Sequence, residues 1–111
     1  LLVASCRMGV ISAGGDESQL AAAGAFGRHL GLAFQIVDDI LDETATPEQL
    51  GKATQKDAAR GKNTYPSLLG LAESRAEAGR QLTSALDAIA AFGQHAAPLH
   101  AIARYIVERE K

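Results

Sequence analysis

The sequence is short of the residues that build disulfide frameworks, zinc sites, basic surfaces and membrane spans. It has one cysteine, Cys6, so no internal disulfide can form, and a reducing, cytoplasmic compartment is expected. Paired cysteines and closely spaced histidines are absent, which argues against a structural zinc site. The net charge of −2 lacks the basic excess of a nucleic-acid binder. No uninterrupted apolar run reaches the roughly 18 residues of a membrane span, so none is expected.

The residues that are present suit one helical domain. The chain has 111 residues, of which 47% are hydrophobic and 22% charged, so it can fold around a core. Alanine and leucine dominate and no hairpin signal occurs, which predicts an all-α fold. The sequence opens without methionine, inside an apolar helical pattern, and we interpret it as a piece of a longer protein.

Start and stop signals divide the chain into helices. Residues 1–12 read as the end of a helix that Gly14 and Gly15 close. Asp16, followed three positions later by Gln19, is a capping-box pattern that opens a long helix from about residue 17 to about residue 43. The later elements are predicted as a short helix at 46–51, a polar basic loop at 52–63, a helix from Pro66 to Leu71, a helix at 75–92, a turn at 93–97 and a last helix opened by Pro98.

The long helix combines an apolar face with costly glycines. Four of its residues follow one face and are predicted to be core: Leu30, Ala33, Val37 and Ile40. Three glycines interrupt it: Gly24, Gly27 and Gly31. Each costs about 1 kcal/mol relative to alanine in a helix interior. They predict close packing against another helix or, as the alternative, close approach of a ligand.

The second half of this helix carries a polar stripe on an otherwise apolar cylinder. The stripe has spacings i, i+3, i+4 and i+7, and its members are Gln35, Asp38, Asp39 and Asp42. The opposite positions are apolar: Ile36, Val37, Ile40 and Leu41. Carboxylates at these spacings repel, so in a partly buried stripe protonation or a bound cation must relieve the repulsion. Carboxylate oxygens suit magnesium, calcium or manganese rather than zinc.

The loop after the stripe supplies the opposite charge. It has four cations within 11 positions: Lys52, Lys56, Arg60 and Lys62. Carboxylates on a helix and lysines on the next loop are the groups that a magnesium–diphosphate clamp needs. The alternative is a solvated acidic face beside a solvated basic loop, and the spacing alone leaves both open.

A longer motif spans the stripe and the loop. FQIVDDILD at residues 34–42, followed by LGKATQKDAARGKNTYPSLLGL at 50–71, resembles the second aspartate-rich region of the trans-prenyl diphosphate synthases. The nearest likeness is to the bacterial farnesyl diphosphate synthases (geranyltranstransferases), and it covers essentially the whole chain. The resemblance implies that residues 1–111 are the C-terminal fragment of a single prenyl diphosphate synthase domain, part of an isoprenoid-synthase helical bundle that forms a homodimer.

The resemblance also implies a reaction and roles for its residues. The reaction is head-to-tail condensation of an allylic diphosphate with isopentenyl diphosphate. It uses three magnesium ions shared with a first aspartate-rich motif that this chain lacks. Asp38 would ligate magnesium directly, and Asp39 and Asp42 directly or through water. Lys52 and Lys62 would pair with the allylic diphosphate, and Gln35 would border the reacting carbons.

Some features depart from the family pattern and leave other interpretations open. Ala45-Thr46 replaces a usual Gly-Asp, and Gln55-Lys56 stands where a glycine is common. Product length is set largely near the first motif, so a geranylgeranyl or longer-chain synthase is an alternative. A non-catalytic helical partner subunit and a helical interaction module are two more. Because half of the metal clamp is absent, residues 1–111 alone are expected to be inactive.

The remaining candidate residues are assigned mainly to packing or to the surface. Cys6 lies on an apolar face and is predicted to be inert. His29, His95 and His100 lack partner spacing and are predicted to be surface or satisfied core histidines. Arg109 lies near the C-terminus, where some family members bring basic residues to the mouth of the active site, and this role is kept as a minor alternative.

Overall fold

The described part of the chain is entirely helical, which confirms the predicted all-α fold. The structure, a computed structural model, describes residues 1–44 and 64–109, and no strand occurs among them. The elements are α1 (Leu2–Ser12), α2 (Glu17–Thr44), α5 (Tyr65–Leu69), α6 (Leu71–Ala88), the 3₁₀ segment η1 (Ala90–Ala96) and α7 (Ala97–Glu108). The predicted short helix at 46–51 and the loop at 52–63 lie outside the described residues.

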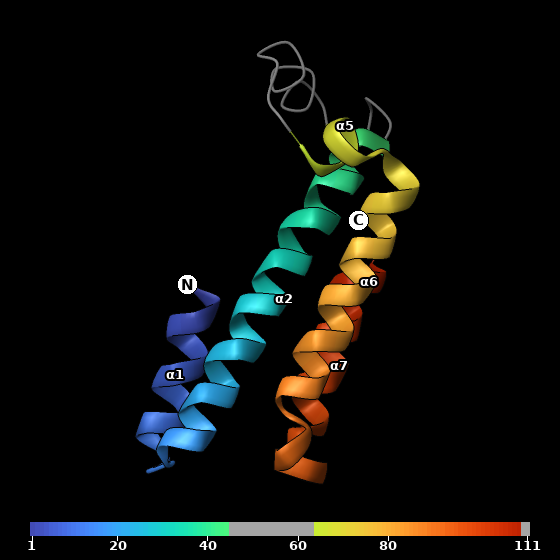
Figure 1. The fold of residues 1–111 in the computed structure, drawn as a ribbon. Coiled ribbons are helices and arrows are strands. Elements are labelled where there is room, and N and C mark those ends of the chain that lie inside the picture. The colour runs from blue at the N-terminus through green and yellow to red at the C-terminus, as the bar shows by residue number, and fades with distance from the viewer. Residues whose placement is uncertain (45–63, 110–111) are drawn as a thin grey trace.

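Helix α2 is the central element. Its most extensive packing is against α6 and then α1, and α7 and α5 also contact it. Figure 1 shows α1 beside the N-terminal half of α2, α6 along another side and α7 behind α6. The described residues form an elongated bundle of 47 × 23 × 23 Å. Every other helix is therefore placed relative to the helix that carries the polar stripe.

The turn between α1 and α2 forms as its sequence predicts. The Gly14 backbone has a φ of 75°, a left-handed conformation that favours glycine. Its N–H donates to the Ile11 carbonyl at 3.0 Å, which terminates α1. The Asp16 N–H donates to Gln19 Oε1 at 2.9 Å, and the Gln19 N–H donates to Asp16 Oδ1 at 2.8 Å. These reciprocal bonds are the predicted capping box, and they start α2 at Glu17.

At Gly27 the backbones of α1 and α2 lie in close contact. A Cβ at this position would lie 2.8 Å from Val3 Cα and 3.1 Å from the Leu2 carbonyl oxygen. A Cβ at Gly24 or Gly31 would meet only side-chain atoms, at 3.7 Å or more. The prediction of tight helix packing is therefore confirmed, and one of the three glycines carries most of the requirement.

The core follows the predicted face of α2. Leu30, Ala33, Val37 and Ile40 are all buried. The buried core forms two clusters along α2. One joins Phe26 and Leu30 to Ala85, Ile89, Ala96 and Ala103, and the other joins Ile36, Val37 and Ile40 to Ala78. Small residues on α6 let its backbone lie close to α2, because alanine needs little space between helices.

The boundary between α5 and α6 differs from the prediction. A helix from Pro66 to Leu71 and another from residue 75 were expected, but α5 ends at Leu69 and α6 already starts at Leu71. Gly70 separates them with φ 85° and ψ 160°, a backbone conformation essentially restricted to glycine. Thr64 and Ser67 form a capping box that starts α5 before Pro66. The short α5 therefore turns away from the axis of α6.

The C-terminal boundaries also shift. The helix expected to reach residue 92 ends at Ala88, and the chain continues as η1, in which Gly93 has a φ of 61°. Pro98 lies in the first turn of α7, as predicted. The apolar residues of α7 are only partly buried: Ala103 is in the core, whereas Ile102 is 52% exposed.

The apolar face of α2 is covered within the described residues, whereas other apolar side chains are not. Helices α6 and α7 pack over Leu30, Val37 and Ile40 and bury them. Most of the large apolar residues that remain exposed lie on α1, α5 and α7, and Phe34 on α2 and Leu71 on α6 are exposed as well. They include Met8, Ile11, Leu68, Leu69, Leu99, Ile102 and Tyr105.

Within the described residues, α2 is the helix to examine for a possible membrane span. Residues Glu17–Glu43 are long and apolar enough to cross a bilayer by length and composition, although charged residues interrupt them. In the fold, 44% of the most apolar window is buried, and α1 and α6 pack against the helix. The core helix of a soluble bundle has these same properties, so the expected absence of a membrane span stays a prediction.

Candidate functional site

The polar stripe lies near the C-terminal end of α2, and its members differ in burial. Gln35 is exposed, Asp38 and Asp42 are half-buried, and Asp39 is only 6% exposed. On the opposite side Ile36 is fully buried, as predicted. The stripe therefore lies at the border between core and surface rather than fully in solvent. A buried carboxylate needs hydrogen bonds or a cation to offset its lost hydration.

Gln35 supplies one hydrogen bond to that buried carboxylate. Its Nε2 donates to Asp39 Oδ1 at 2.9 Å, between positions i and i+4 of the same helix. The amide must be the donor, because an ionised carboxylate can only accept. The bond joins one exposed and one buried member of the stripe. Two of the four residues of the stripe are thus directly connected.

A cation just beyond the end of α7 lies beside the start of the stripe. The Arg109 guanidinium lies over the Phe34 ring, 4.8 Å from its centroid, and Arg109 Nε donates to the Ile106 carbonyl at 3.0 Å. Phe34 precedes Asp38 by one helical turn, so a positive charge is held near the aspartates. From the sequence, a role for Arg109 at the site is only a minor alternative. The available signal is the spacing of Ala103, Ile106 and Arg109, which extends one face of α7 to the residue that follows the helix.

The carboxylates fit magnesium in their chemistry but do not close a metal site by themselves. In residues 1–44 and 64–109, no group of three or more His, Cys, Asp or Glu side chains is arranged to hold a metal ion. Asp38 and Asp42 offer oxygen ligands from partly exposed positions, which suits a hard cation that keeps water and shares further ligands. The described residues therefore do not complete a metal site, and the magnesium role of the stripe stays a prediction.

The predicted diphosphate-binding lysines cannot be placed relative to the stripe. Lys52 and Lys62 lie outside the described residues. Their assignment stays a prediction, and so does the clamp that they would complete with the aspartates.

A second polar group joins α2 to α6. The His29 Nδ1 and Gln81 Oε1 lie 2.8 Å apart, and Gln81 Nε2 donates to Glu77 Oε1 at 2.8 Å. The hydrogen bonds from Gln81 and then Arg80 lower the pKa of Glu77. Hydrogen bonds to Glu73 and Glu77 raise the pKa of Arg80. His29 thus has a polar partner, as expected for a satisfied histidine, and the group fixes α6 against α2.

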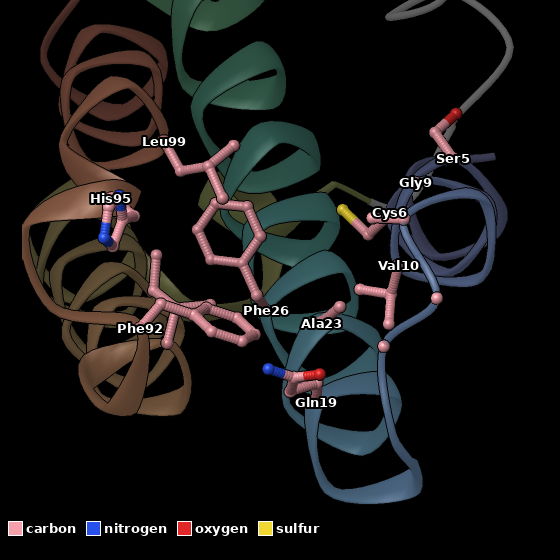
Figure 2. Close-up of a pocket in the computed structure, with 14 residues that line it drawn as sticks. Ser5, Cys6, Gly9, Val10, Gln19, Ala23, Phe26, Phe92, His95 and Leu99 are labelled. Atoms are coloured by element: carbon pink, nitrogen blue, oxygen red, sulfur yellow. The ribbon is translucent and has the colours of Figure 1, made fainter.

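A large cavity lies at the other end of α2. It has a volume of about 940 Å³ and is lined by α1, the N-terminal half of α2, η1 and the start of α7. Figure 2 shows Cys6, Phe26, Phe92 and Leu99 around it. None of its lining residues is Asp, Glu, Lys or Arg. Phe26 precedes Asp38 by twelve positions, or about 18 Å along a helix, so the cavity is separate from the stripe. Partial burial raises the pKa of the Cys6 thiol.

Comparison with known proteins agrees with the motif. Residues 1–102 match the polyprenyl synthetase family. The chain is 44% identical over 109 residues to a dimethylallyltranstransferase from Fischerella ambigua, which covers 98% of the chain and 32% of the relative. It is 44% identical over 110 residues to geranylgeranyl pyrophosphate synthase 9, chloroplastic, from Arabidopsis thaliana, covering 98% and 31%.

A third relative is described as one subunit of a heterodimer. The chain is 40% identical over 112 residues to heterodimeric geranylgeranyl pyrophosphate synthase large subunit 2 from Arabidopsis thaliana, covering 100% of the chain and 30% of the relative. The chain spans about a third of the length of these curated relatives. The motif, the helical fold and the match over residues 1–102 agree, and the chain belongs to the polyprenyl synthetase family, a family of prenyltransferases with an all-α fold.

Proposed function

We propose that this chain is the C-terminal part of a prenyl diphosphate synthase. The enzyme would join an allylic diphosphate to isopentenyl diphosphate, head to tail, in a magnesium-dependent reaction. The observation that supports this most directly is the stripe on α2, where three aspartates and Gln35 share one face at the border of the core. Family membership supports the same chemistry.

The residues of the chain would bind and orient the allylic diphosphate. Asp38 and Asp42 would hold magnesium, with Asp39 acting directly or through water. Lys52 and Lys62 would bind the diphosphate oxygens. Bound magnesium would neutralise charge that develops on the leaving diphosphate. The buried apolar residues beneath the stripe, such as Val37 and Ile40, would keep water away from that side of the site.

We propose two alternative products, which differ in chain length. The sequence motif resembles that of the farnesyl diphosphate synthases, whereas two of the three relatives named above are geranylgeranyl synthases. Farnesyl and geranylgeranyl diphosphate are therefore equally supported products. We further propose a homodimer in the cytoplasm. A non-catalytic partner subunit is the second candidate function, because one relative is named as a subunit of a heterodimer.

The test is prenyl transfer by the full-length protein that carries this chain. Purified protein is incubated with magnesium, labelled isopentenyl diphosphate and dimethylallyl, geranyl or farnesyl diphosphate, and product lengths are resolved by chromatography. We expect elongation that ends at one main length. The Asp38→Ala variant should lose activity, and Asp87→Ala, at an exposed position of α6, should keep it. Absence of elongation from every allylic partner would contradict the enzyme and favour the partner subunit.

Residues 1–111 alone provide a second test. We propose that they do not catalyse prenyl transfer, because the described carboxylates do not complete a metal site. Repeatable elongation by the purified 111-residue chain would show that the chain holds a complete site.

A further inference from the structure

The hydrogen bond between Gln35 and Asp39 suggests a role for Gln35 that differs from contact with substrate. The acceptor is a nearly buried carboxylate, and the donor is an exposed amide one turn earlier on α2. A buried carboxylate that lacks a donor is costly, so the amide contributes more here than a solvated surface pair would. The bond also restricts rotation of the carboxylate about its own side chain.

The chemistry of an amide suits this position. Glutamine donates a hydrogen bond without changing the net charge of the stripe, so the three carboxylates keep their attraction for cations. A glutamate at position 35 would repel Asp39 at the i,i+4 spacing, and a lysine would neutralise part of the stripe. Carboxylates that bind metals are commonly oriented by such outer hydrogen bonds.

We propose that Gln35 is a positioning residue, which orients the Asp39 carboxylate toward a divalent cation and influences prenyl transfer through that carboxylate. This rests on the proposed function. It replaces the role that the family resemblance gives to Gln35, which is contact with the reacting carbons. The 2.9 Å bond commits one amide hydrogen to the carboxylate.

The first experiment measures metal binding without any substrate. The free Mn²⁺ concentration is followed by electron paramagnetic resonance in titrations of the full-length protein. Gln35→Met keeps the length of the side chain and removes the donor, and loss of such an outer partner weakens metal binding by about tenfold or more. Gln94→Met, at an exposed position of η1 at the other end of the bundle, is the matched control and should not change the affinity. Unchanged Mn²⁺ affinity in Gln35→Met, within about twofold, would overturn the proposal.

The second experiment tests whether Gln35 acts through Asp39. In a double-mutant cycle, Gln35→Met combined with Asp39→Ala should bind Mn²⁺ no more weakly than Asp39→Ala alone. Losses that multiply would mean that the two side chains act independently, which contradicts the proposal. If Asp39→Ala does not fold, the single Gln35→Met titration still decides the question.

Kinetics separate the two roles of Gln35. If the residue positions a metal ligand, Gln35→Met raises the magnesium concentration needed for half-maximal rate, and saturating magnesium restores most of kcat. If it contacts the reacting carbons, kcat stays low at every magnesium concentration, and the proposal fails. A wild-type protein that shows the Mn²⁺ coupling but makes no prenyl diphosphate would refute the proposed function and leave the positioning role intact.

Discussion

Replacement of Gly27 by alanine tests the close backbone contact between α1 and α2. The new Cβ would lie 2.8 Å from Val3 Cα and 3.0 Å from Val3 N, which are backbone atoms and cannot rotate away. Overpacking of this kind costs roughly 1–3 kcal/mol. Alanine recovers about 1 kcal/mol through its better helix propensity. We therefore expect Gly27→Ala to lower the free energy of unfolding by about 0–2 kcal/mol.

Alanine substitutions at two other glycines serve as controls, because they gain the same helix propensity without the close backbone contact. A Cβ at Gly24 meets side-chain atoms at 3.7 Å or more, and a Cβ at Gly79 meets nothing within 4 Å. Gly79→Ala should stabilise by up to about 1 kcal/mol, and Gly24→Ala should be neutral or stabilising. The difference between the Gly27 and Gly79 variants is then about 1–3 kcal/mol. Urea denaturation of the full-length protein measures it, and equal shifts for all three variants would refute the close approach of α1.

Further predictions concern the stripe, the loop and two titrating groups. In the full-length enzyme, Asp38→Ala should lower turnover by about 100-fold or more, and a rate within about threefold of wild type would contradict its role as a metal ligand. Lys52→Ala should raise the KM for the allylic diphosphate more than that for isopentenyl diphosphate, and equal changes would argue against the predicted contact. The pKa of Glu77 is lowered in the fold, so its ionised carboxylate stabilises the protein above pH 4.5, and this stabilisation is lost as the pH falls through the lowered pKa. Glu77→Gln should therefore make the free energy of unfolding less sensitive to acid. The raised pKa of Cys6 predicts slower alkylation by iodoacetamide at pH 8 than for free cysteine, and an equal rate would contradict its burial.

Local signals in the sequence predicted the helix ends that depend on local chemistry. Asp16 and Gln19 form their cap within one turn, and Gly14 ends α1 through its own backbone, so neither needs a distant contact. The boundary at Gly70 was missed because one glycine between leucines also occurs inside helices. The end of α6 was placed too late because apolar spacing continues through Phe92, beyond the last α-helical turn.

The sequence predicts which face of α2 carries the site, but not how deeply each of its residues is buried. Helical spacing alone places Gln35 and the three aspartates on one side of α2. Whether each residue is exposed depends on the helices that pack nearby. Ala78 of α6 and Val107 of α7 pack against the apolar residues next to the stripe. Burial of Asp39 therefore required tertiary structure. Arg109 is separated from Phe34 by more than 70 positions, and only the packing of α7 brings the two together.

The central place of α2 has a consequence for how the site can respond to a substrate. A helix packed against α1, α5, α6 and α7 can lose its hydrogen bonds only when most of the bundle opens. The amide protons of Leu30, Val37 and Ile40 should therefore exchange with deuterium at the slow rate of global unfolding. The aspartates are then held on a rigid helix. In the proposed synthase, any closure around a bound diphosphate would therefore come from other segments, which would move toward α2 while α2 stays in place.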